Sequence, residues 1–146
     1  MLSGYATPAG TDTYRQRFAT SVHPLHFRLS ADLWLSSIGL GTYLGDATAQ
    51  VDELYTAALR QALVCGCNVL DAAINYRHQR SERVIGQVLP ALAREGILTR
   101  DEIVVATKGG YLAFDGDVPP DPRAYVQEAF IKTGLASADD IRLYLK

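Results

Sequence analysis

The sequence predicts an α/β fold in which strands alternate with helices to form a parallel sheet, preceded by an N-terminal β-hairpin. Short apolar runs typical of strands alternate with longer segments whose apolar residues recur every three or four positions, in the order β-α-β-α-β. Polar side chains follow these apolar runs directly, where parallel strands with right-handed crossovers carry reactive groups. The chain therefore has the pattern of an α/β enzyme.

Composition and charge exclude several classes of protein. The 146 residues, 48% hydrophobic and 21% charged, suffice for a domain with a real core. Fourteen basic and sixteen acidic residues are scattered, which argues against nucleic-acid or anionic-membrane partners. No apolar run approaches the roughly 18 residues of a membrane helix, and residues 1–20 lack the apolar centre of a secretory signal. We therefore expect a cytoplasmic protein.

The N-terminal part is expected to begin without regular structure. Residues 1–24 are rich in small and polar residues without sustained periodicity, which predicts an irregular segment. Residues 25–29 and 33–36 then alternate between apolar and polar side chains, which favours a β-hairpin. His23 and His26 are interpreted as surface residues of this hairpin and not as metal ligands.

The first strand and helix of the sheet region follow. Residues 38–43 predict a brief strand whose Gly39 and Gly41 are either a simple strand-to-loop pair or a place where a ligand approaches the backbone. A helix that ends at Gly66 is predicted from apolar residues at helical spacing. These residues are Val51, Leu54, Tyr55, Ala58, Ala62 and Leu63.

Two more strands and a second helix complete the alternation. Residues 68–73 predict the second strand, and residues 101–108 predict a third strand with an apolar centre buried on both faces. Between them a helix begins at Ser81, and Pro90 inside it is expected to kink but not break it. The apolar stripe of this helix is Val84, Ile85, Val88, Leu89 and Leu92.

The C-terminal part is less regular. Residues 109–120 form a long loop, after which Pro122 opens a helix that Gly134 closes. Residues 139–146 alternate as in a half-exposed strand, but they equally suit the start of a helix. Both interpretations stay open.

The two cysteines, Cys65 and Cys67, are interpreted as small core residues in a reducing compartment. A disulfide between residues so close in sequence would be strained, and no further Cys or His at suitable spacing suggests a metal site.

Three residues with chemical function fall at or beyond the predicted strand ends. Asp71 ends the second strand, Tyr76 lies in the loop behind it, and Lys108 ends the third strand. If these strands are neighbours, their axes lie about 4.8 Å apart, so the Lys108 ammonium can contact both Asp71 and Tyr76. A cation next to a phenol stabilises the phenolate and makes the hydroxyl a better proton donor. The pattern therefore predicts a tyrosine activated as a general acid.

A series of motifs in this chain resembles the N-terminal half of the aldo-keto reductases. The resemblance covers roughly residues 33–110. Its motifs, in order, are residues 38–43, Gly66 and Asn68 leading into residues 71–73 with Tyr76, the Ser81-Glu82 pair followed by Ile85-Gly86, and residues 104–108.

The resemblance implies a partial (β/α)8 TIM barrel that uses NADP(H) to reduce small-molecule aldehydes and ketones by hydride transfer. By motif, Tyr76 would be the general acid that protonates the carbonyl oxygen, Lys108 would strengthen it as an acid, and Asp71 would hold Lys108. The residues expected beside the nicotinamide end of the cofactor are Gly41, Thr42, Tyr43 and Asp71.

The chain departs from the family pattern at three places. Ala72 stands where the family commonly has threonine, and residues 77–80 replace a short glycine-containing loop, which reshapes the substrate mouth. His78 is either a solvated loop residue, which we favour, or a residue that lines this mouth. The resemblance implies a catalytic histidine at the end of a fourth strand, and the chain has no histidine after His78. If residues 140–145 are a remnant of that strand, Lys146 stands about where the histidine belongs, and otherwise the strand is not reached. A whole barrel needs about 250 residues. We therefore expect residues 25–146 to be a truncated N-terminal half of such a barrel. It is either a truncated product or fragment, or a half-barrel whose exposed sheet edges a second copy or a second half covers.

Two other functions compete with this one. The chain could be a non-catalytic half-barrel that serves as an assembly or interaction module. Lys108 could instead form a Schiff base in a lyase. A nucleophilic lysine needs a depressed pKa, however, and Asp71 beside Lys108 would raise the pKa of that lysine.

Overall fold

The computed structural model describes residues 2–140. The chain divides into two compact units, Met1–Gly116 and Asp117–Lys146. The candidate chemistry lies in the first unit.

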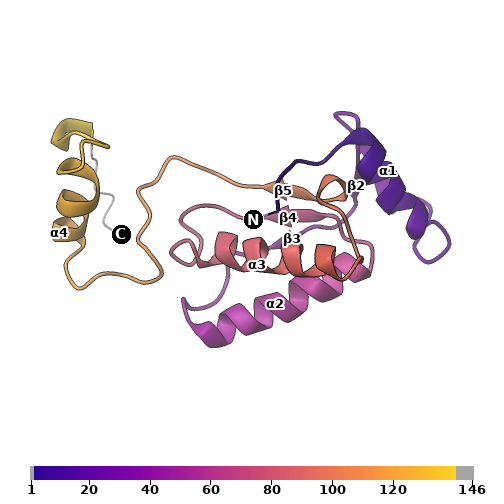
Figure 1. Cartoon of the computed structure of the whole chain (residues 1–146), viewed down its shortest axis with the longest axis horizontal. Helices are drawn as coiled ribbons and strands as arrows, with labels where there is room; N and C mark the ends of the chain where they lie inside the picture. The colour runs from indigo at the N-terminus through magenta and orange to yellow at the C-terminus, as the bar shows by residue number, and fades with distance from the viewer. Residues whose placement is uncertain (1, 141–146) are drawn as a thin grey trace. The chain divides into compact units, whose positions relative to one another are not determined.

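The first unit is built on a three-stranded parallel sheet in the order β3-β4-β5. The strands β3 (Leu40–Gly41), β4 (Val69–Asp71) and β5 (Val104–Ala106) alternate with the helices α2 (Ala49–Val64) and α3 (Arg80–Arg94). The two helices pack against each other on one side of the sheet (Figure 1). The predicted order β-α-β-α-β is confirmed, although each strand is shorter than its apolar run.

The core is filled chiefly by α3. Its predicted stripe is buried in full, and the helix runs through Pro90 without a break. The predicted stripe of α2 is partly wrong, because Leu54 is 64% exposed while Leu59 is fully buried. The inner face of α2 consists of positions 51, 55, 59 and 63, which recur every four residues. Apolar residues on other faces of the helix obscured this spacing in the sequence.

Strand β5 is less buried than predicted. Val104 and Val105 are half-buried and Ala106 is exposed, because β5 is an edge strand of the sheet that the described residues form. Burial on both faces is therefore wrong for this strand as the structure shows it.

The predicted hairpin is confirmed. Strands β1 (Phe27–Ser30) and β2 (Leu33–Ser36) pair antiparallel through a two-residue turn. Ala31 and Asp32 both have positive φ, at 46° and 63°, as a tight turn of twisted strands requires. Asn68, fully buried, joins this hairpin to the sheet by accepting from the Ser36 amide at 2.9 Å.

The prediction that residues 1–24 are irregular is wrong, because α1 (Pro8–Arg17) forms there. Thr7 caps the helix by accepting from the Gly10 amide at 2.9 Å, and Pro8 occupies the first turn. The helix carries few apolar residues, so periodicity could not reveal it. Its anchor is the buried Tyr14, whose hydroxyl donates to the Leu63 carbonyl at 2.5 Å.

The second unit holds the helix predicted from Pro122. Helix α4 (Pro122–Val126) continues as a π-helix (Gln127–Ile131), and a 3₁₀ turn spans Ala138–Asp140. The Asp121 side chain caps α4, and Gly134 follows the helical segment with φ of 75°. Residues 141–146 lie outside the described residues, so both interpretations of the C-terminal segment stay open.

Both cysteines are free thiols, of which Cys67 is buried and Cys65 is exposed. The prediction of a core residue is therefore confirmed for Cys67 and wrong for Cys65, which is the exposed C-cap residue of α2. No helix in residues 2–140 combines the length and apolarity needed to cross a membrane.

Candidate active site at the strand ends

The carboxyl ends of the three parallel strands meet at one edge of the sheet. The register places Gly41 of β3 and Ala106 of β5 on either side of Asp71 of β4. Two residues beyond Ala106, Lys108 reaches back over this edge. The strand neighbours that the sequence argument required are therefore present.

Lys108 connects the predicted trio. Its Nζ donates to Asp71 Oδ1 at 2.7 Å, to Tyr76 Oη at 2.9 Å and to the Ala72 carbonyl at 2.9 Å. An ammonium group has three hydrogens, so these acceptors use all of them. The structure thus brings Asp71, Tyr76 and Lys108 together on the rim.

The electrostatics of the trio keep Lys108 charged. The hydrogen bond with Asp71, followed by that with Tyr76, raises the pKa of Lys108 and outweighs slight desolvation. The Lys108 side chain is 50% exposed and that of Asp71 is 42% exposed, so the group faces solvent. A charged lysine is a poor Schiff-base nucleophile, which disfavours the lyase alternative.

The Tyr76 hydroxyl keeps its own proton available. Because its oxygen accepts from Lys108, the hydroxyl hydrogen is free to point to another acceptor. An acceptor that approaches from solvent can therefore receive a proton from a phenol already in contact with a cation.

The predicted cofactor loop lies beside Tyr76, but its three residues differ in accessibility. The exposed Tyr43 ring meets the Tyr76 ring edge to face, with centroids 5.0 Å apart. Gly41 is open, since no atom lies within 4 Å of a Cβ built on it. Thr42 is 1% exposed, and its hydroxyl donates to the Asp71 carbonyl at 2.8 Å. Gly41 and Tyr43 are therefore accessible to a ligand, whereas the Thr42 side chain is part of the support.

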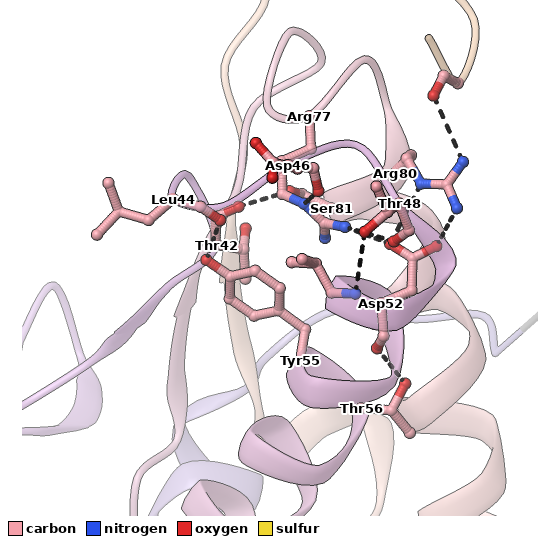
Figure 2. A network of polar contacts seen from close by, with 12 residues as sticks. Thr42, Leu44, Asp46, Thr48, Asp52, Tyr55, Thr56, Arg77, Arg80 and Ser81 are labelled. Atoms are coloured by element: carbon pink, nitrogen blue, oxygen red, sulfur yellow. Dashed lines mark hydrogen bonds and ion pairs between the residues drawn. The ribbon is translucent and has the colours of Figure 1, made fainter.

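The loop predicted to reshape the substrate mouth contains a residue that sequence reasoning missed. The Arg77 side chain is 1% exposed and pairs with Asp52 at 2.5 Å, and Arg80 pairs with the same carboxylate at 2.6 Å (Figure 2). Arg77 is therefore buried support and not a mouth residue. His78 is half-buried, with its ring 5.7 Å from that of Phe114. Asp52 lies in the first turn of α2, and no periodicity or motif connects it with Arg77, so sequence reasoning could not find this network.

Asp52 is held ionised by its two partners. Partial burial acts to raise the pKa of Asp52, but hydrogen bonds from Arg80 and Arg77 outweigh it and hold that pKa below its usual range. Two cations thus share one carboxylate, which leaves the network with excess positive charge.

Other regions offer less chemistry. In the part of the chain that the structure describes, no group of three His, Cys, Asp or Glu side chains could hold a metal ion. A cavity of about 270 Å³ lies between α1 and the hairpin, lined in part by Arg15, His23 and Trp34. None of the residues lining this cavity belongs to the rim.

The chain is similar in sequence to one known family of enzymes. The model of the aldo/keto reductase family matches residues 37–141. The NADH-specific methylglyoxal reductase of Escherichia coli (strain K12) is 35% identical over 86 residues, which cover 56% of this chain. The match spans 24% of the length of that relative. The matched family segment contains the whole rim described above.

Proposed function

The chain belongs to the aldo/keto reductase family, and from this membership we propose that it carries the proton-donating part of a nicotinamide-dependent carbonyl reductase. The observation that carries the proposal is the set of hydrogen bonds from Lys108 Nζ to Asp71 and Tyr76. We also propose that its strands form part of a (β/α)8 barrel, with the rim at the carboxyl ends of the strands.

In the proposed mechanism the carbonyl oxygen of the substrate lies next to the Tyr76 hydroxyl. Tyr76 donates its proton to that oxygen as negative charge develops there. Lys108 remains protonated and stabilises the phenolate left behind, since its ammonium already donates to the Tyr76 oxygen. Asp71 keeps the ammonium charged and in place.

The exposed residues of the rim fit a nicotinamide cofactor. Gly41 leaves its backbone open to close approach, and the exposed Tyr43 ring offers an aromatic surface next to Tyr76. A bound nicotinamide dinucleotide supplies the hydride. Gly41, Tyr43 and Asp71 would hold its nicotinamide end in this proposal, with Thr42 fixing the backbone beneath.

The identity of the dinucleotide is a separate proposal. The resemblance favours NADP(H), whereas the Escherichia coli relative is named NADH-specific. We propose NADP(H) as the cofactor and test it by comparing the Michaelis constants for NADPH and NADH. A preference for NADH would overturn the choice of cofactor and leave the proton-transfer roles intact.

The substrate is proposed to be a small aldehyde or ketone. The name of the relative, a methylglyoxal reductase, makes short dicarbonyls the first compounds to assay. Because the rim is open, its described residues set no size limit.

The test measures NADPH and NADH oxidation by the purified protein with a panel of aldehydes. Tyr76→Phe is expected to lower kcat by about 10²–10⁴-fold, the usual contribution of a general acid. Tyr5→Phe is the matched control, because Tyr5 is 76% exposed and lies outside the rim. Equal turnover by Tyr76→Phe and wild type would contradict the proposed mechanism.

A second candidate is the assembly module. It is favoured by the two edge strands of the sheet, β3 and β5, because within the described residues no further strand pairs with the outer edge of either one. Open edges promote association with another chain. A monodisperse dimer in solution that binds neither dinucleotide would support this function over the reductase.

A further inference from the structure

We propose that Arg77 is a positioning residue for Tyr76: its buried guanidinium ties the turn behind Tyr76 to the loop that follows Tyr43, and so keeps the Tyr76 hydroxyl on Lys108. The inference rests on the proposed role of Tyr76 as proton donor. Its evidence lies in the backbone of residues 77–79 and in the contacts of one side chain.

The turn behind Tyr76 has an unfavourable backbone. Arg77, His78 and Gln79 are consecutive residues with φ of 49°, 53° and 71°. Glycine adopts this left-handed region freely, whereas residues with a Cβ do so at a steric cost and rarely in succession. A turn of this kind persists only where its surroundings hold it. Glycine would adopt these φ values at a lower steric cost than Arg77, His78 and Gln79 do. We therefore look to the contacts of these three side chains for the interactions that stabilise the turn.

Arg77 supplies the largest set of these contacts. Its Nε donates to the Asp46 carbonyl at 3.1 Å, and its Nη2 donates to the Thr48 carbonyl at 3.3 Å and to the Asp52 carboxylate at 2.5 Å. Figure 2 shows the guanidinium directed into the space between the 44–48 loop and the first turn of α2. One side chain thus joins the turn behind Tyr76 to two other segments.

The same side chain is connected to Tyr43 through Tyr55. The Arg77 guanidinium carbon lies 4.9 Å from the centroid of the Tyr55 ring, and the Tyr55 hydroxyl donates to the Leu44 carbonyl at 2.8 Å. Leu44 follows Tyr43, whose ring contacts the Tyr76 ring. Because Tyr76 precedes Arg77, the contacts form a closed ring that fixes both tyrosines.

Arg80 provides a matched control. It pairs with Asp52 as Arg77 does, and it reaches the Gly116 carbonyl at 3.4 Å, but its hydrogen bonds include none to the carbonyls of the 44–48 loop. Arg80→Lys therefore keeps the charge but disturbs the hydrogen bonding of the Asp52 carboxylate, without removing the link to the Tyr43 loop.

The first experiment uses NMR on the chain itself and needs no turnover. Wild type should show cross-peaks between the Tyr76 ring and the Lys108 side chain, and between the Tyr43 and Tyr76 rings. In Arg77→Lys both sets should be lost, because the single Nζ of a lysine cannot stand at both the Nε and the Nη2 positions from which the Arg77 guanidinium meets these acceptors. Arg80→Lys should keep both sets. Retention of both sets in a folded Arg77→Lys variant would overturn the inference.

A second variant decides the matter if Arg77→Lys does not fold. Tyr55→Phe keeps the ring beneath Arg77 and removes only the hydroxyl that holds the Leu44 carbonyl. We expect loss of the Tyr43–Tyr76 cross-peaks with the fold intact, and their persistence would contradict the proposed ring of contacts.

The kinetic arm separates this inference from the proposed function. In an active enzyme, Arg77→Lys should lower kcat by about 100-fold with KM little changed, the cost of a displaced reacting group. A protein without reductase activity would refute the proposed function, while the NMR result would still decide whether Arg77 positions Tyr76. An active enzyme whose kcat is unchanged in Arg77→Lys would overturn the positioning role alone.

Discussion

At the strand ends, Lys108 is the residue on which the proposed chemistry depends. Its three ammonium hydrogens meet a carboxylate, a phenol and a backbone carbonyl. The backbone carbonyl fixes the position of Nζ, the carboxylate keeps it charged, and the phenol is the group it acts on. The sequence motif predicted the carboxylate and the phenol, whereas the Ala72 carbonyl emerged only from the structure.

Removing Asp71 should make Lys108 titrate at lower pH. Asp71 is the main cause of the raised pKa of Lys108, so in Asp71→Asn the ammonium should lose its proton nearer its ordinary value of about 10.4. The side chain of Lys108 can be followed by NMR as pH rises in wild type and variant. An unchanged titration midpoint of Lys108 would show that its ion pair with Asp71 does not set the pKa of the lysine. Since a raised pKa keeps the charge to higher pH, any activity that needs the ammonium should fall earlier on the alkaline side in the variant.

At the scale of the elements, polar contacts hold the ends of helices and strands where apolar packing is thin. Helix α1 buries Tyr14 and presents little other apolar surface. Helix α3, by contrast, begins after a left-handed turn without a side-chain cap and depends on its buried stripe. The periodic apolar stripe of α3 therefore predicted that helix from sequence, whereas α1 has no such stripe and was not predicted.

Tyr14→Phe should loosen α1 from the sheet unit. The Tyr14 side chain is fully buried, and its hydroxyl donates to the Leu63 carbonyl at 2.5 Å and lies 3.2 Å from the Cys67 carbonyl. In Tyr14→Phe both carbonyls would lose this partner. Burial raises the pKa of Tyr14, so the hydroxyl stays a donor at ordinary pH. We expect a loss of about 1–3 kcal/mol in the free energy of unfolding, measured by urea titration. Tyr5→Phe should change it by less than about 0.5 kcal/mol, and equal effects of the two changes would refute the anchoring role.

Asp52→Asn should destabilise the junction of α2 and α3. The buried Arg77 would lose its counter-charge, and breaking a buried pair costs about 3–5 kcal/mol. Because the Asp52 side chain is 27% exposed, we expect a loss near the lower end of that range, about 3 kcal/mol.

The same variant tests the sign of the pH dependence. The pKa of Asp52 is lowered in the folded protein, so its stabilisation is present above the unfolded value of about 3.9 and is lost as pH falls through the lower folded value. Urea titrations of wild type and Asp52→Asn at falling pH should converge below that value. A constant difference between the two proteins at all pH values would contradict the ionised pairing.

At the scale of the whole molecule, much of the first unit followed from sequence. The alternation of strands and helices, the hairpin and the burial of the α3 stripe were predicted correctly. The rim residues fell at strand ends, and the meeting of Asp71 with Lys108 then followed from strand order alone. These features depend on local pattern and on the geometry of parallel strands.

The remaining features depend on contacts between distant segments. Arg77 reaches Asp52 across 25 positions, and Tyr14 reaches Cys67 across 53 positions. Neither pair has a periodic signature. Thr42 appeared in a ligand loop by motif, yet its amide and hydroxyl both bond the Asp71 carbonyl. Polar side chains that hold loops look like ligand residues in a sequence until their partners are known.

The most direct measurement of the central claim is a double-mutant cycle between Tyr76 and Lys108. The claim is that Lys108 acts on the carbonyl through Tyr76, so the two residues form one device. We predict that Lys108→Met lowers kcat strongly in the wild-type background but hardly at all in the Tyr76→Phe background, since residues that act as a unit are not additive. Losses that multiply in the double variant would contradict the account, because they would mean that the lysine and the tyrosine work independently.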